Sequence, residues 1–194
     1  AIGYDLYLDL LQRTVADLKA RAAAGLDYEA TEEIDPEINL HLSAYIPETY
    51  IPDISQRYIS YRRIAALSTA DDEAAGDLMD ELADRYGPIP AETRNLLHIV
   101  RLKKGLIRLR IAKLERGPGN LVFSFLNQTP LAPSLLLNWL DKMGKKQKTR
   151  YRLTQDGRLI INLDQGQGGD LFGLIEQALH QLEQLIPSGP EILP

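Results

Sequence analysis

The spacing of the apolar residues changes close to residue 110, and this change limits the possible folds more than any other feature of the sequence. Between residues 54 and 108, apolar side chains recur every three to four positions, which is typical of amphipathic helices. Between residues 111 and 163, they fall in short runs separated by glycine-containing turns, which is typical of strands and hairpins. The sequence therefore predicts an α+β fold. A helix-rich N-terminal half is followed by short antiparallel strands, arranged as hairpins and packed with helices.

Three helices are predicted in the N-terminal half, within residues 53–108. Asp53 follows a proline and can cap the first helix with its carboxylate. The second helix covers residues 71–86 and ends at Gly87, the residue type that most often terminates helices. Pro90 then opens the third helix, which continues as far as the change in spacing.

Strands are predicted before the first of these helices and after the third. Ile38, Leu40 and Leu42 alternate with polar residues, which indicates a half-buried strand. Turns that contain glycine join the later strands into two hairpins, and Asp170 can cap the last helix. The later strand segments are residues 111–115, 121–126, 150–154 and 158–163, and the two C-terminal helices are residues 131–143 and 171–185.

Composition divides the chain into four segments. Residues 1–25 have helical spacing, and residues 26–36 form an acidic linker that contains alanine and glycine. Residues 37–187 form one domain, and residues 188–194 form a flexible tail rich in proline and glycine. The chain begins without methionine and directly with helical spacing, so we expect it to be a piece of a longer protein.

The residue types needed for common catalytic sites are missing or scattered. Cysteine is absent, which excludes disulfides, thiolate catalysis and cysteine metal sites. Neither a phosphate-binding loop nor a Gly-x-Ser-x-Gly turn occurs. His41, His98 and His180 fall on different predicted elements, without the spacing of zinc hydrolases. We therefore expect no catalytic site, no metal site and no cofactor in this chain, and no apolar run is long enough to predict a membrane helix.

Charge is distributed very unevenly along the chain. Residues 27–100 contain sixteen acidic and five basic residues, whereas residues 101–152 contain thirteen basic and two acidic residues. The basic stretch can grip phosphate groups, so a nucleic-acid-binding accessory domain is one candidate function. Aromatic residues that could stack on bases are scarce there, and the net charge is −5. A solvated face, or pairing of the basic stretch with the acidic one, is the other interpretation.

One face of the predicted helix 71–86 is acidic. Asp77, Glu81 and Asp84 fall on the side opposite its apolar residues, and Arg85 lies four positions after Glu81 and can pair with it. Such a stripe can bind a basic partner surface. From periodicity alone, an ordinary solvated helix face is the favoured interpretation, because exposed charge is common.

Five segments, within about residues 1–126, carry a resemblance to known proteins. Two of them are specific when they occur together, namely Pro47-Glu48-Thr49-Tyr50-Ile51-Pro52-Asp53 and Glu81-Leu82-Ala83-Asp84-Arg85-Tyr86-Gly87. The other three are Gly3-Tyr4-Asp5-Leu6-Tyr7, Arg57-Tyr58-Ile59-Ser60-Tyr61-Arg62-Arg63-Ile64-Ala65 and Ile111-Ala112-Lys113-Leu114-Glu115. In this order and spacing, the segments resemble the C-terminal domain of the bacterial transcription-repair coupling factors, the Mfd family.

The resemblance implies a parent protein that is an ATP-driven DNA translocase of the bacterial cytoplasm, with ATP and Mg²⁺ as its cofactors. Such a parent removes stalled RNA polymerase and recruits UvrA of nucleotide excision repair. Residues 1–25 are then the end of the translocase module, and residues 37–187 are a non-catalytic regulatory domain. This domain docks on the UvrB-like N-terminal module of the same chain and masks the UvrA-binding surface until polymerase engages.

The resemblance also implies which residues dock. Glu81 and Asp84 match the acidic residues that contact the UvrB-like module, with Arg85 beside them, and Asp77 is added from helix geometry. Direct contact of this domain with DNA, or with a membrane, is not expected. A small hydrolase that uses dispersed carboxylates is the remaining alternative, and it requires a polar pocket with strongly shifted carboxyl pKa values.

Overall fold

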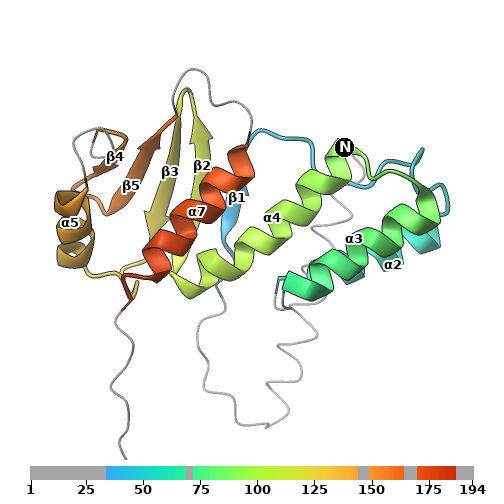
Figure 1. Ribbon diagram of the computed structural model, residues 1–194, viewed down its shortest axis with the longest axis horizontal. Helices are drawn as coiled ribbons and strands as arrows, with labels where there is room; N and C mark the ends of the chain where they lie inside the picture. The colour runs from blue at the N-terminus through green and yellow to red at the C-terminus, as the bar shows by residue number, and fades with distance from the viewer. Residues whose placement is uncertain (1–33, 69–71, 144–148, 164–169, 187–194) are drawn as a thin grey trace, which may run out of the picture. The chain divides into compact units, whose positions relative to one another are not determined.

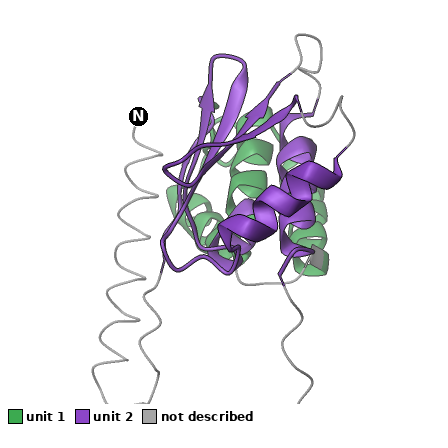
Figure 2. Cartoon of the chain, turned by 90° about the vertical axis from the view of Figure 1, so that its left-hand side faces the viewer, with its two compact units in different colours: residues 1–33, 42–101 green, residues 34–41, 102–194 purple. Residues whose placement is uncertain are grey.

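The structure is a computed structural model that describes residues 34–68, 72–143, 149–163 and 170–186 (Figure 1). The described residues form two compact units, shown in Figure 2. The helical unit contains residues 42–101, and the sheet unit contains residues 34–41 together with the described residues from 102 onward. The helix predicted for residues 1–25, most of the acidic linker, and the tail at residues 188–194 lie outside the described residues. The four-segment division stays a prediction.

The helical unit is built from α2 (Ile54–Ala66), α3 (Asp72–Tyr86) and the first part of α4 (Ala91–Arg108), which the division between the units crosses after Arg101. The predicted caps are present at α2 and α3. The carboxylate of Asp53 accepts a hydrogen bond of 2.8 Å from the backbone amide of Gln56. Gly87 ends α3 with a φ of 86°, a conformation that side chains with a Cβ rarely adopt.

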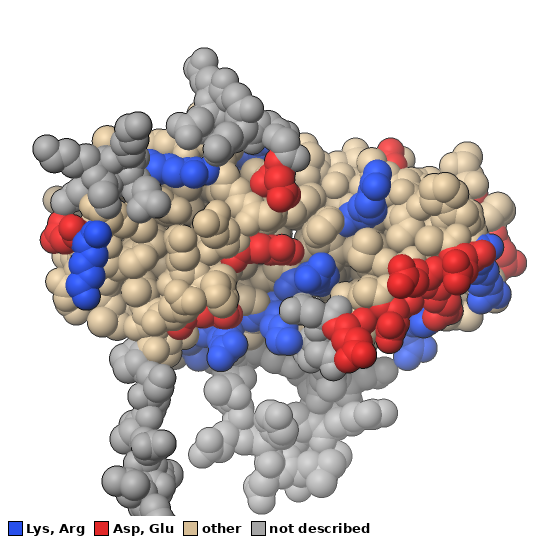
Figure 3. Space-filling view, in the orientation of Figure 1, with Lys and Arg blue, Asp and Glu red and all other residues tan. Residues whose placement is uncertain are grey.

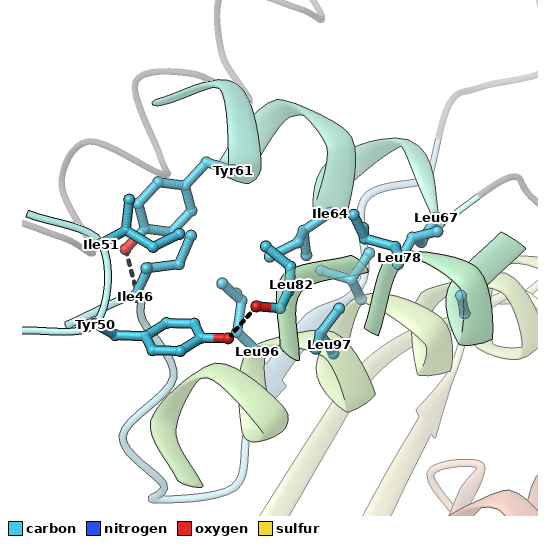
Figure 4. Close-up of a cluster of buried hydrophobic side chains, with 12 residues drawn as sticks. Ile46, Tyr50, Ile51, Tyr61, Ile64, Leu67, Leu78, Leu82, Leu96 and Leu97 are labelled. Carbon is cyan, nitrogen blue, oxygen red and sulfur yellow. Dashed lines mark hydrogen bonds between the residues drawn. The ribbon is translucent and has the colours of Figure 1, made fainter. Parts of the chain in front are cut away.

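The core of the helical unit lies between these helices and the segment that precedes α2 (Figure 4). Two tyrosine hydroxyls connect that segment to the helices through hydrogen bonds. The hydroxyl of Tyr61 accepts from the backbone amide of Ile46 at 2.8 Å, and that of Tyr50 donates to the carbonyl oxygen of Leu82 at 2.9 Å. The buried cluster is Ile46, Tyr50, Ile51, Tyr61, Ile64, Leu67, Ala75, Leu78, Leu82, Leu96, Leu97 and Val100.

The sheet unit contains one five-stranded sheet in the order β1-β2-β3-β5-β4. Its strands are β1 (Glu37–Asn39), β2 (Ile111–Gly117), β3 (Asn120–Phe125), β4 (Tyr151–Leu153) and β5 (Arg158–Asn162). The unit also holds α5 (Pro133–Lys142), α7 (Leu171–Glu183) and the last part of α4. These bounds confirm the predicted α+β fold, both hairpins, and the cap that Asp170 forms on α7 by accepting from Gly173 at 2.8 Å.

The sheet is mixed, which the sequence did not predict. Strand β1 pairs in parallel with β2, with Ile38 opposite Leu114, while the other pairs are antiparallel. β1 ends at Asn39, earlier than the alternation of apolar residues suggested, and His41 just beyond it has a φ of 54°. A three-residue strand that pairs across more than seventy positions leaves no local signal of its direction.

One face of the sheet is covered by α7 and the last turns of α4 (Figures 1 and 2). Leu121, Phe123, Leu159 and Ile161 are fully buried. A Cβ added at Gly105 of α4 would lie 3.2 Å from Leu179 Cδ1, so this glycine permits the close approach of α7. In the described part of the chain, no helix is both long enough and apolar enough to cross a membrane.

Candidate functional site

Helix α3 separates an apolar face from an acidic one, as its spacing predicts. Ala75, Leu78 and Leu82 are buried in the core of the helical unit. Asp77, Glu81 and Asp84 are exposed on the other side. On the face shown in Figure 3, acidic side chains gather into a band over this helix.

Asp80 is also exposed on α3, and sequence reasoning left it out of the candidate site. The signal was present, because Asp80 lies three positions after Asp77 and four before Asp84. The acidic face of α3 is therefore defined by Asp77, Asp80, Glu81 and Asp84.

Glu81 is paired with an arginine of the neighbouring helix. Arg63 of α2 donates to both carboxylate oxygens, from Nη1 to Oε1 at 2.6 Å and from Nη2 to Oε2 at 2.5 Å. This bidentate pair holds the pKa of the Glu81 carboxyl below its ordinary value and raises the pKa of Arg63. The charge of Arg85 also lowers the pKa of Glu81, but the direct ion pair is formed with a residue eighteen positions away, which spacing along one helix could not identify.

Arg85 lies at the end of α3 among aromatic rings. Its guanidinium carbon is 5.3 Å from the ring centre of Tyr86, which meets the ring of Tyr50 edge to face at 5.8 Å. The Tyr50 hydroxyl lies 3.2 Å from the carbonyl oxygen of Gly87, in addition to its bond to Leu82. Burial and the neighbouring Tyr86 raise the pKa of this hydroxyl above its ordinary value. The two most specific sequence segments therefore meet at the C-terminal end of α3.

Asp77, Asp80 and Asp84 differ from Glu81 in their surroundings. None of these three carboxylates forms an ion pair or a side-chain hydrogen bond with another described residue. They are exposed, and they keep their negative charge facing solvent. Because unpaired surface carboxylates attract cationic groups, this face is suited to bind a basic surface.

The basic stretch behaves differently, because several of its cations are paired within the sheet unit. Lys103 binds Asp35 at 2.6 Å. Lys113 binds Glu37 at 3.4 Å and Glu115 at 2.9 Å. Arg108 lies 3.8 Å from Glu183, and Lys145, Lys146 and Lys148 lie outside the described residues. These pairs favour the interpretation that the charged stretches neutralise each other in part, and they weaken the nucleic-acid alternative.

The remaining candidates for chemistry lie on separate elements. His98 lies on α4, His180 lies on α7, and no group of three His, Asp or Glu side chains in the described segments could hold a metal ion. The pKa values of Glu81 and Asp156 are both lowered, by Arg63 and by the Thr154 hydroxyl respectively. A general acid needs a raised pKa, so neither group supports the hydrolase alternative.

Comparison with known proteins identifies a family that this chain matches. Residues 40–136 match the TRCF domain family. The chain is 33% identical to the transcription-repair-coupling factor of Myxococcus xanthus over 93% of the chain and 14% of that protein. It is 31% identical to the Escherichia coli transcription-repair-coupling factor over 94% of the chain and 15% of that protein. The chain thus spans only a small part of the length of these relatives.

A solved structure shares the fold. The crystal structure of the C-terminal domain of a transcription-repair coupling factor superposes with a TM-score of 0.61, covering 80% of this chain and 96% of that one. Its sequence is 22% identical, so this likeness concerns the fold alone.

Proposed function

Since the chain belongs to the TRCF domain family, we propose that it is a non-catalytic regulatory domain of a bacterial transcription-repair coupling factor. In this proposal the parent is a cytoplasmic DNA translocase that uses ATP and Mg²⁺, removes stalled RNA polymerase and recruits UvrA. The domain docks on the UvrB-like module of the same parent. Docking masks the UvrA-binding surface until polymerase engages the parent.

The observation that carries this proposal is the exposed acidic face of α3. Asp77 and Asp84 have no cationic partner among the described residues, although Arg63 and Arg85 are close by on the same unit. A basic surface of the UvrB-like module would supply the missing cations. The partner's cations would also meet Glu81, where they compete with Arg63.

A contact of this kind suits a switch because it is reversible. An exposed ion pair contributes about 0.2–1 kcal/mol, so a few of them hold a closed state without locking it. Binding of polymerase then needs only a few kcal/mol of differential affinity to shift the population towards the open state. Salt weakens such contacts, which makes the docking equilibrium sensitive to ionic strength.

The direct test is a titration of this chain with the separately produced UvrB-like module, followed by calorimetry. Asp84→Lys is expected to weaken binding by about tenfold or more at low salt, because it places a cation against a basic surface. The loss is expected to shrink at about 1 M salt, where charges are screened over about 3 Å. Glu48→Lys is the charge-matched control, because it reverses one exposed carboxylate outside α3; since it also removes the ion pair with Arg57, circular dichroism checks that this variant remains folded.

The consequence in the intact parent can be measured as well. Glu81→Ala combined with Asp84→Ala is expected to raise both UvrA affinity and ATPase activity, because the closed state loses its contacts. Arg63→Ala tests whether loss of the ion pair between α2 and α3 alone has this effect. If the double variant keeps wild-type UvrA affinity and ATPase activity, the acidic face of α3 does not hold a closed state.

A further inference from the structure

Helix α2 leaves large apolar side chains in solvent. Ile54, Tyr58 and Ile59 are 66%, 40% and 48% exposed, whereas most large apolar residues of the described chain are buried. These three account for half of the six large apolar residues that are exposed in the described segments. Single exposed apolar residues are ordinary, but a group on one helix marks an interaction surface.

Packing within the helical unit does not explain this group. The side of α2 that faces the core supplies Ser60, Tyr61 and Ile64. Ile54 and Tyr58 are one helical turn apart on another side, and Ile59 lies about 100° further round the helix, next to Arg63. The fold therefore buries one side of α2 and leaves its remaining, solvent-facing side, which carries these three apolar residues, without a partner among the described residues.

This apolar side is continuous with the acidic face of α3. Ile59 and Arg63 are neighbours on the surface of α2, because they are four positions apart. Arg63 in turn donates two hydrogen bonds to the carboxylate of Glu81. Glu81 lies four positions after Asp77 and three before Asp84. The bidentate pair thus joins the two helix faces into one surface and fixes the position of α2 beside α3.

We propose that Ile54, Tyr58 and Ile59 form the apolar half of the docking surface whose acidic half is on α3. The partner is a protein surface that carries apolar side chains flanked by lysine or arginine. Interfaces of this type combine an apolar centre that contains aromatic residues with charged groups at its rim. The inference rests on the proposed function, because it assigns the chemistry of the same partner.

Charge selects this occupant over others. Asp77, Asp80 and Asp84 need cations from the partner, and nucleic acids and anionic lipid headgroups bring none. Arg62 lies four positions after Tyr58 and is exposed, so it offers one place for a carboxylate of the partner. A protein surface with an apolar centre, a basic flank and one carboxylate can bind the apolar residues of α2, the acidic face of α3 and Arg62 at once.

Within this surface, the two halves contribute differently. The acidic half steers the encounter and depends on salt, while the apolar half stabilises the complex and does not. Arg63 contributes as a positioning residue, because it holds the two helices together without needing to touch the partner.

The test compares variants of the two halves in the same titration with the UvrB-like module. Ile59→Ser and Tyr58→Ala are each expected to raise the dissociation constant by about tenfold, at low and at high salt alike. Leu137→Ser is the matched control, because Leu137 is 52% exposed on α5 of the sheet unit. It is expected to bind like the wild type. Thermal unfolding followed by circular dichroism checks that the variants remain folded, which their exposure predicts.

The outcomes separate this inference from the function on which it rests. If Asp84→Lys weakens binding while Ile59→Ser and Tyr58→Ala do not, the α2 face is no part of the docking surface and the inference fails alone. If the wild-type chain does not bind the module at all, both proposals fail. If Ile59→Ser instead abolishes self-association in sedimentation velocity, or binding to a DNA duplex, a different occupant covers α2 and the inference is overturned.

Discussion

The hydroxyl of Tyr50 meets the carbonyl oxygens of Leu82 and Gly87 at the C-terminal end of α3. Its ring is buried against Tyr86. Arg57 of α2 holds the preceding segment in place, donating to the carbonyl oxygen of Ile51 at 2.7 Å and pairing with Glu48 at 3.1 Å. Tyr50 thus helps to position α3 and does not itself form the candidate docking surface.

Replacement of Tyr50 by phenylalanine isolates this contribution. Tyr50→Phe is expected to lower the free energy of unfolding by about 1 kcal/mol, because a buried hydrogen bond is lost and its acceptors remain. Urea unfolding followed by circular dichroism measures the change. Tyr58→Phe is the control, because the Tyr58 hydroxyl is exposed and forms no hydrogen bond with a described residue. Equal unfolding free energies for the two variants would show that the Tyr50 hydroxyl adds nothing.

The candidate site shows, residue by residue, what spacing can predict. The exposure of Asp77 and Asp84 follows from the 3.6-residue period of one helix, so it was accessible from the sequence. The partner of Glu81 was not accessible, because Arg63 comes from another helix and its approach depends on how α2 and α3 pack. A long flexible side chain satisfies many such geometries, and only the folded structure selects one.

At the scale of elements, α3 contains one glycine and is followed by another, and the roles of the two are opposite. Gly76 lies within the helix and a Cβ there would meet no atom within 4 Å, whereas Gly87 ends the helix at a φ of 86°. A glycine inside a helix costs conformational entropy, while a glycine at positive φ avoids a steric clash. The same substitution should therefore change stability in opposite directions at the two positions.

The two substitutions are expected to change the free energy of unfolding by similar amounts but in opposite directions. Gly76→Ala is expected to raise the free energy of unfolding by about 0.5–1 kcal/mol, and Gly87→Ala to lower it by about 1 kcal/mol. Chemical denaturation of both variants measures the difference, with each serving as the control for the other. A change of the same sign in both would contradict either the helical conformation at position 76 or the end of α3 at position 87.

Most elements could be placed from the sequence because their signals are local. The caps at Asp53 and Asp170, the end of α3 at Gly87, and the turn at Gly157 with a φ of 73° each depend on a few adjacent residues. The parallel pairing of β1 with β2 depends on residues far apart in the chain, and loop closure over that distance leaves no mark on local composition. The sequence therefore predicted the strands but not the sheet that they form.

At the scale of the whole molecule, the sheet unit is not continuous in sequence. Residues 34–41 belong to it, although the helical unit intervenes before residue 102. β1 covers one edge of β2, and two ion pairs, Lys113 with Glu37 and Lys103 with Asp35, join this segment to the rest of the unit. Leu40 is also buried there. Removal of residues 34–41 would expose a strand edge and an apolar site.

A truncation tests whether this segment is integral to the sheet unit. Residues 102–194 alone are expected to self-associate, because the free edge of β2 can pair with another chain. Placing residues 34–41 before residue 102 through a flexible Gly/Ser linker is expected to restore a monomer, as measured by sedimentation velocity. The same linked chain with Leu40→Asp is the control, because a buried charge prevents the segment from docking. If residues 102–194 alone are monomeric and unfold with the same free energy as the linked chain, β1 contributes nothing to the unit, and its pairing with β2 is incidental.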